Sequence, residues 1–111
     1  MKDTPLAGED DCSPDLAAIP PDAIVQVLKI INQKGLHARA SAKFVQTVEK
    51  FDADVRVTRC GETVGGKSIL GLMTLGAGPG TDITVDACGK DAQAVIAALD
   101  ALISGRFGEE E

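Results

Sequence analysis

One histidine is the side chain of this sequence best suited to nucleophilic chemistry. His37 is the only histidine among 111 residues, and it stands in the segment Gly35-Leu36-His37-Ala38-Arg39. A turn precedes it and a helical composition begins at Ala38, so the imidazole is predicted at the start of a helix. Free backbone N–H groups and the positive end of the helix dipole meet there and favour a bound anion. The planar donors of Arg39 suit phosphate oxygens, so the pattern indicates a phosphoryl group held on the ring.

An exposed histidine without any function is an equally open interpretation of His37, because corner loops lie at the surface by default. A metal site is poorly supported, since one histidine without neighbouring ligands cannot complete a coordination shell. The three cysteines, Cys12, Cys60 and Cys88, are far apart and form no CxxC pair. This usage favours reduced thiols in a cytoplasmic protein over a disulfide framework or a zinc site. We expect no metal and no cofactor.

Ser68 is the second candidate for chemistry. It follows Gly65-Gly66-Lys67 and precedes an apolar segment. One interpretation is a simple N-cap serine, and the other is a phosphorylation site at a helix end. The Gly-Gly-Lys-Ser segment lacks the spacing of a nucleotide-binding P-loop, so that reading is rejected.

The short apolar segment after Ser68 holds more hydrophobic residues than one buried face can use. Its residues Ile69, Leu70 and Met73 therefore belong either to the core or to an exposed contact surface. Basic residues could ring this area or simply form a solvated face; they are Lys34, Arg39, Lys43 and Lys67.

Alternating and helical hydrophobic patterns predict the elements that carry these residues. Strands are expected at 24–31, 55–58, 62–64 and 82–87. Helices are expected at 38–51 and 69–75 and from Asp91, which is placed to cap the last one, to a stop at Gly105. Each helix has one apolar face; in the first it comprises Ala40, Phe44, Val48 and Phe51. The order β-α-β-β-α-β-α indicates an α+β fold, an open-faced β-sandwich with a four-stranded antiparallel sheet covered on one side by three helices.

Charge divides the chain into a body and two acidic ends. The formal net charge is −6, and residues 1–22 contain six acids and one lysine. We therefore expect an acidic flexible extension at 1–22, one domain at 23–106 and an acidic tail at 107–111. An acidic chain with 3% aromatic residues is a poor candidate for nucleic-acid binding. No apolar run is long enough to span a membrane, so no insertion is expected.

Two of these segments together resemble the HPr family, the histidine-containing phosphocarriers of the bacterial phosphoenolpyruvate-dependent phosphotransferase system. The segment from Gly35 to Arg39, followed by Ala42-Lys43-Phe44-Val45, resembles the phosphohistidine motif of that family. The segment from Gly66 to Gly76 resembles its regulatory-serine motif. The resemblance runs from about Ile24 to Gly105, which is nearly the whole body of the chain.

The resemblance implies a monomeric carrier that takes part stoichiometrically and is not a stand-alone catalyst. His37 would accept phosphate on Nδ1 from enzyme I and pass it to enzyme IIA-type proteins, with Arg39 stabilising the transferred group. An HPr kinase/phosphorylase would modify Ser68. Partners would contact Ile69, Leu70 and Met73, and the basic residues Lys43 and Lys67 would face partner acids.

One position departs from the family, because Ala40 stands where a proline is usual. Alanine keeps the helix but does not fix φ in its first turn. The alternative function is a regulatory interaction protein that acts through phosphorylated Ser68 in nitrogen or carbon signalling, with little or no sugar transport.

Overall fold

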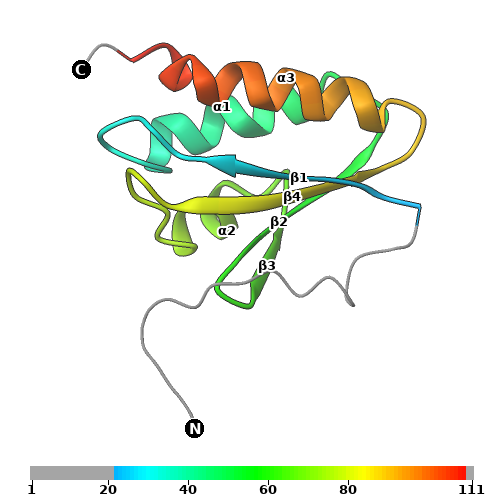
Figure 1. Ribbon diagram of the computed structural model, residues 1–111. Helices are drawn as coiled ribbons and strands as arrows, with labels where there is room; N and C mark the ends of the chain where they lie inside the picture. The colour runs from blue at the N-terminus through cyan, green and yellow to red at the C-terminus, as the bar shows by residue number, and fades with distance from the viewer. Residues whose placement is uncertain (1–21, 110–111) are drawn as a thin grey trace, which may run out of the picture.

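The computed structural model describes residues 22–109, which form seven helices and strands and a closing turn (Figure 1). These elements are, in chain order, β1 (Ile24–Lys29), α1 (Ala38–Val48), β2 (Asp54–Arg59), β3 (Glu62–Gly65), α2 (Ile69–Thr74), β4 (Asp82–Cys88) and α3 (Ala92–Ser104), followed by a short 3-10 turn at Arg106–Gly108. The predicted order β-α-β-β-α-β-α is confirmed.

The four strands form one antiparallel sheet with the order β1-β4-β2-β3. Strand β4 is central to the described sheet: Leu28 of β1 pairs with Ile83, and Val57 of β2 pairs with Val85. These four side chains are buried, because successive residues of a strand point to opposite faces and this set points towards the helices.

The helices lie on one face of that sheet. Figure 1 shows α1 and α3 side by side along it, and α3 also contacts β1 and β4. The shorter α2 packs against α1 and β3. The α+β open-faced β-sandwich predicted from the sequence is therefore confirmed.

The apolar stripe predicted for the first helix holds for three of its four members. Ala40, Phe44 and Val48 are fully buried, whereas α1 ends at Val48 and Phe51 is only partly buried. The first strand is also shorter than expected and ends at Lys29. Ile30 is still held by two backbone hydrogen bonds, from its N–H to Thr81 O at 2.8 Å and from Gly80 N–H to its carbonyl at 2.7 Å.

The capping role predicted for Asp91 is wrong. Asp91 occupies the N-cap position of α3, but its side chain makes no capping hydrogen bond. Its backbone φ of −105° and ψ of 25° depart from the extended conformation that a capping side chain needs. The carboxylate instead accepts a hydrogen bond from Asp52 N–H at 2.8 Å and so ties the loop between α1 and β2 to the start of α3.

The core continues past Arg106, where the sequence analysis ends the domain. Phe107 is fully buried although it lies in the segment expected to be a tail. Arg106 and Phe107 both have left-handed backbone conformations, with φ of 58° and 56°. Such conformations cost roughly 1 kcal/mol or more each for residues other than glycine. Burial of the Phe107 ring offsets that cost and fixes the course of the chain up to Glu109.

The expectation of reduced cysteines is wrong for Cys60, which is disulfide-bonded. Cys88 is the free cysteine of residues 22–109. The cysteine pattern therefore no longer supports a reducing compartment. The acidic extension predicted at 1–22 lies outside the described residues except for Asp22. Within the described residues, every helix is too short or too polar to cross a bilayer.

Candidate functional site

A tight loop between β1 and α1 sets the position of His37. The Nδ2 atom of the buried Asn32 donates to Gly35 O at 2.9 Å, and Gly35 N–H donates back to Asn32 O at 3.1 Å. Leu36 N–H donates to Ala77 O at 2.9 Å, and the Leu36 side chain is buried. These contacts anchor the residue before the histidine on both its backbone and its side chain.

Gly35 is required by the geometry of this loop. Its φ is +63°, and a Cβ atom placed on it would lie 2.3 Å from Ala77 O and 2.9 Å from Gly78 Cα. Both neighbours are backbone atoms, so they cannot rotate away as a side chain would. The loop after α2 thus packs directly against the loop that carries His37.

His37 occupies the N-cap position of α1, as predicted. Its backbone is extended (φ −77°, ψ −176°), and its side chain does not cap the helix. The first hydrogen bond of the helix runs from Ser41 N–H to His37 O at 2.9 Å. The N–H groups of residues 38–40 therefore precede the helical ladder and point towards the region of the imidazole. Ala40 is fully buried, and the helix begins at Ala38 without the proline.

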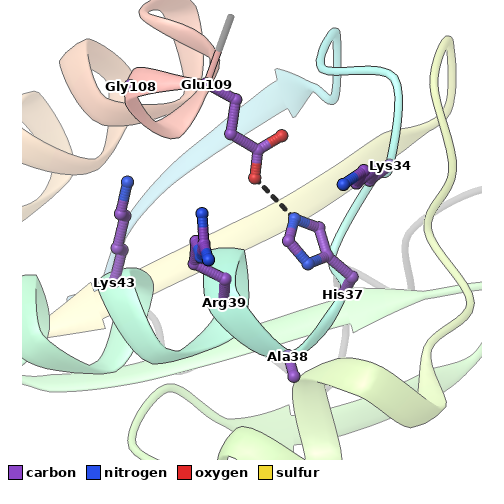
Figure 2. Close-up of a pocket in the computed structure, with 7 residues that line it drawn as sticks. All are labelled: Lys34, His37, Ala38, Arg39, Lys43, Gly108 and Glu109. Atoms are coloured by element: carbon purple, nitrogen blue, oxygen red, sulfur yellow. Dashed lines mark hydrogen bonds and ion pairs between the residues drawn. The ribbon is translucent and has the colours of Figure 1, made fainter.

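Three basic side chains surround the imidazole. Lys34, His37, Arg39 and Lys43 line a single open cavity of about 560 Å³ (Figure 2). The guanidinium of Arg39 is exposed and has no hydrogen-bond or ion-pair partner between residues 22 and 109. Lys43 donates through Nζ to Phe107 O at 2.5 Å, which brings the closing turn against α1. The cavity wall consequently offers positive charge beside a nitrogen nucleophile.

Glu109 is the site residue that the sequence analysis missed. Its Oε2 atom lies 2.5 Å from His37 Nε2, and the histidine and glutamate side chains are 28% and 11% exposed. Figure 2 shows the carboxylate above one ring nitrogen, with the other nitrogen turned away from it. The contact joins residues 72 positions apart in the chain. The sequence offers one signal for this contact. Phe107 is an isolated aromatic residue near the end of the chain, and such a residue favours a segment that packs onto the core.

Ser68 caps α2, which agrees with the first of the two interpretations, an N-cap serine. Its Oγ atom accepts a hydrogen bond from Gly71 N–H at 2.9 Å, and the residue is exposed. The capping role does not decide between a structural serine and a modified one, because an exposed hydroxyl at a helix start suits both.

The apolar segment of α2 divides between core and surface. Leu72 is fully buried, whereas Ile69, Leu70 and Met73 are 40%, 75% and 39% exposed. The contact-surface interpretation therefore fits these three side chains better than the core interpretation.

The basic residues do not form one ring around that surface. Lys34, Arg39 and Lys43 belong to the His37 cavity, whereas Lys67 lines two smaller hollows beside β2 and β3. Among the described residues, no group of three or more His, Cys, Asp or Glu side chains is arranged to hold a metal ion.

Comparisons with known proteins point to one family. The family model for the PTS HPr component phosphorylation site matches residues 24–105. The phosphocarrier protein HPr of Neisseria meningitidis serogroup A is 50% identical over 86 residues, which cover 78% of this chain and 97% of that protein.

Solved structures give the same result. The crystal structure of HPr-C-His from Thermoanaerobacter tengcongensis superimposes with a TM-score of 0.76 at 41% identity, covering 79% of this chain and 99% of the other. The solution structure of Crh, the Bacillus subtilis catabolite repression HPr, has a TM-score of 0.55 at 38% identity and covers 72% and 95%.

Proposed function

This chain belongs to the HPr family of phosphotransferase-system phosphocarriers, and we propose that it accepts a phosphoryl group on His37 from phosphorylated enzyme I and passes it to enzyme IIA-type proteins. One observation carries this proposal. A half-buried imidazole stands at a helix start, in a cavity walled by Lys34, Arg39 and Lys43. A nitrogen nucleophile beside several positive charges is the arrangement that phosphoryl transfer needs.

Transfer needs little besides position and charge. A lone pair of the His37 ring forms the N–P bond while the bond between phosphorus and its donor atom on enzyme I breaks. Arg39, which has no partner among the described residues, is available to the phosphoryl oxygens, and the first amides of α1 add donors. Handing the group to an acceptor is the same step in reverse. The protein is thus used stoichiometrically and requires no cofactor.

The proposed docking surface is the exposed side of α2. Ile69, Leu70 and Met73 form it, and α2 packs against α1, whose first residue follows His37. A carrier that exchanges partners needs a small interface that releases quickly, and a few exposed apolar side chains suit it. Membership of the HPr family, and no longer the cysteine pattern, supports a monomer in the cytoplasm as the proposed working form.

We also propose that phosphorylation of Ser68 by an HPr kinase/phosphorylase regulates transfer. Ser68 is exposed and adjoins Ile69 and Leu70 of the docking surface. A phosphate there adds about −1.5 to −2 charges. Like charge in front of an acidic partner weakens association by up to a few kcal/mol at close approach.

Two substitutions at Ser68 separate charge from capping. Asp and Asn are both good N-cap residues, so Ser68→Asp and Ser68→Asn are expected to keep α2 within about 0.5 kcal/mol of each other. Only Ser68→Asp adds charge, and it is expected to slow phosphorylation by enzyme I roughly 10- to 100-fold. Stopped-flow or quench-flow rates measure this. Equal rates for the two variants would refute the electrostatic account of regulation.

A regulatory function without sugar transport is the second candidate. The similarity to a Bacillus subtilis protein named for catabolite repression favours it, together with the exposed Ser68. Affinity capture with Ser68-phosphorylated and unmodified protein distinguishes the two functions. A regulatory protein binds a partner only in the phosphorylated form, whereas a carrier binds enzyme I in the unmodified form.

The carrier function has a direct test. The full chain is incubated with enzyme I and phosphoenolpyruvate, and the product is mapped by mass spectrometry under neutral conditions. We expect close to one acid-labile phosphate per chain, on the peptide that contains His37, and its loss on addition of an enzyme IIA-type protein. A chain that stays unlabelled, or that carries acid-stable phosphate alone, is incompatible with the proposal.

A further inference from the structure

The Glu109 carboxylate is held in place from several sides. Its Oε1 atom accepts a hydrogen bond from Asn32 Nδ2 at 3.1 Å, and Asn32 is fully buried. Its backbone N–H donates to Arg106 O at 3.0 Å. The buried Phe107 ring and the hydrogen bond from Lys43 to Phe107 O fix the turn that precedes it.

Asn32 is oriented to donate. Its Nδ2 atom serves both Gly35 O and Glu109 Oε1, whereas its buried Oδ1 has no hydrogen-bond partner in the described part of the chain. Rotating the amide would place Oδ1 against Gly35 O and Glu109 Oε1, which are both acceptors, and would lose both donated hydrogen bonds. The same side chain therefore shapes the loop before His37 and positions the carboxylate over its ring.

The carboxylate determines which ring nitrogen keeps the proton. An ionised carboxylate only accepts hydrogen bonds, and both Glu109 oxygens are used in that way, one by Asn32 and one by His37 Nε2. A neutral imidazole has one protonated nitrogen and one lone pair, and the hydrogen bond made by one nitrogen sets the state of the other. With the proton on Nε2, the lone pair is on Nδ1, which is turned away from Glu109 (Figure 2).

We propose that Glu109 is a positioning residue for phosphoryl transfer, which holds the Nε2 proton of His37 so that Nδ1 is the nucleophile. This inference rests on the proposed function for its chemical consequence, but the tautomer itself is a property of the unphosphorylated chain.

Charge gives Glu109 a second effect on the same step. When Nδ1 donates its lone pair to phosphorus, the ring keeps the Nε2 proton and becomes cationic. The adjacent carboxylate stabilises that charge as it develops, as preorganised groups do in other active sites. In the return step the N–P bond breaks, the electron pair returns to Nδ1 and the ring becomes neutral again. No proton enters or leaves, so the carrier can work in both directions.

The tautomer is measured directly by nitrogen NMR. Because His37 is the only histidine, ¹⁵N-histidine labelling gives one pair of ring signals. At a pH where the ring is neutral, we expect a protonated Nε2 and an unprotonated Nδ1. Glu109→Lys replaces the acceptor with a donor and is expected to shift the population towards protonated Nδ1. Glu49→Lys makes the same charge change at the other end of α1 and is expected to leave both signals unchanged.

Transfer rates test the effect on chemistry. At metal sites, a carboxylate often accepts a hydrogen bond from the second nitrogen of a ligand histidine. Its loss there lowers metal affinity or activity by roughly 10- to 100-fold. We expect Glu109→Gln to lower the rate of phosphorylation of His37 by a similar factor, although it keeps the size of the side chain. Glu109→Asp keeps the charge and is expected to recover part of the rate. If Glu109 had a purely structural role, Glu109→Gln would keep a higher rate than Glu109→Asp, because glutamine matches the shape of glutamate better than aspartate does.

Failure of this inference differs from failure of the carrier function. Unchanged ring signals in Glu109→Lys, or full rates in Glu109→Gln, overturn the role of Glu109 while the wild-type chain still accepts phosphate. A wild-type chain that accepts no phosphate overturns the carrier function, and the ring signals still decide the tautomer.

Discussion

Replacing His37 with alanine is expected to reduce labelling by enzyme I and phosphoenolpyruvate to background, a loss of more than about 10³-fold in rate. The reason is chemical: the chain has no other histidine, and the basic groups of the cavity position a phosphoryl group but cannot bond to it as the imidazole does. Acid-labile phosphate per chain is the measurement, followed over time at fixed enzyme I.

The same substitution is expected to leave the fold intact. The His37 side chain does not cap α1 and is 28% exposed, so its removal chiefly costs the contact with Glu109 and is expected to lower the free energy of unfolding by about 1–3 kcal/mol. Thermal unfolding followed by circular dichroism provides this control. Acid-labile labelling that persists in His37→Ala would show that phosphate resides elsewhere and would refute the proposed site.

A second large effect is expected from Gly35→Ala, which should destabilise the protein by about 2–4 kcal/mol. The added methyl group would lie 2.3 Å from Ala77 O, and φ of +63° is unfavourable for alanine. For a domain of this size such a loss lowers Tm by roughly 10–25 °C. Because the clash pushes apart the loop before His37 and the loop after α2, the phosphorylation rate should fall as well.

Gly76→Ala is the matched control for that experiment. Gly76 has nearly the same conformation, with φ of +65°, but a Cβ atom there would meet nothing within 4 Å. The Gly76→Ala variant therefore measures backbone strain without a clash. We expect it to lower the free energy of unfolding by about 1 kcal/mol. Equal losses in the two variants would mean that the methyl group added at Gly35 meets no costly clash with the 77–78 backbone.

Local patterns were sufficient to predict the architecture, because each strand and helix carries its own periodicity. Val55 and Val57 alternate with polar neighbours, and Ala40, Phe44 and Val48 recur at helical spacing, so the faces that pack together could be identified before the structure. Asp91 shows the limit of such reasoning. Its place at the helix start was predicted correctly and its capping role was not, because the carboxylate binds Asp52 N–H, a partner that only the tertiary structure brings near.

The site was predictable to the extent that it is local. His37, Arg39 and the helix start lie within a few residues of one another, and the structure gathers them in one cavity with Lys43. Glu109 was not predictable, since its partner lies 72 residues earlier and the intervening turn uses left-handed conformations at Arg106 and Phe107 that no propensity favours. An acidic stretch is ordinarily a solvated tail, and only the burial of Phe107 turns it towards the ring.

The separation of His37 and Glu109 along the chain has a consequence during protein synthesis. Ribosomes add roughly 5–20 residues per second, so roughly 4–14 s of translation separate the two residues. A nascent chain halted before residue 109 would present an imidazole without its carboxylate, and one halted before β4 would also lack the strand that joins β1 to β2. Polypeptides released early from the ribosome would therefore carry the histidine but not its finished surroundings.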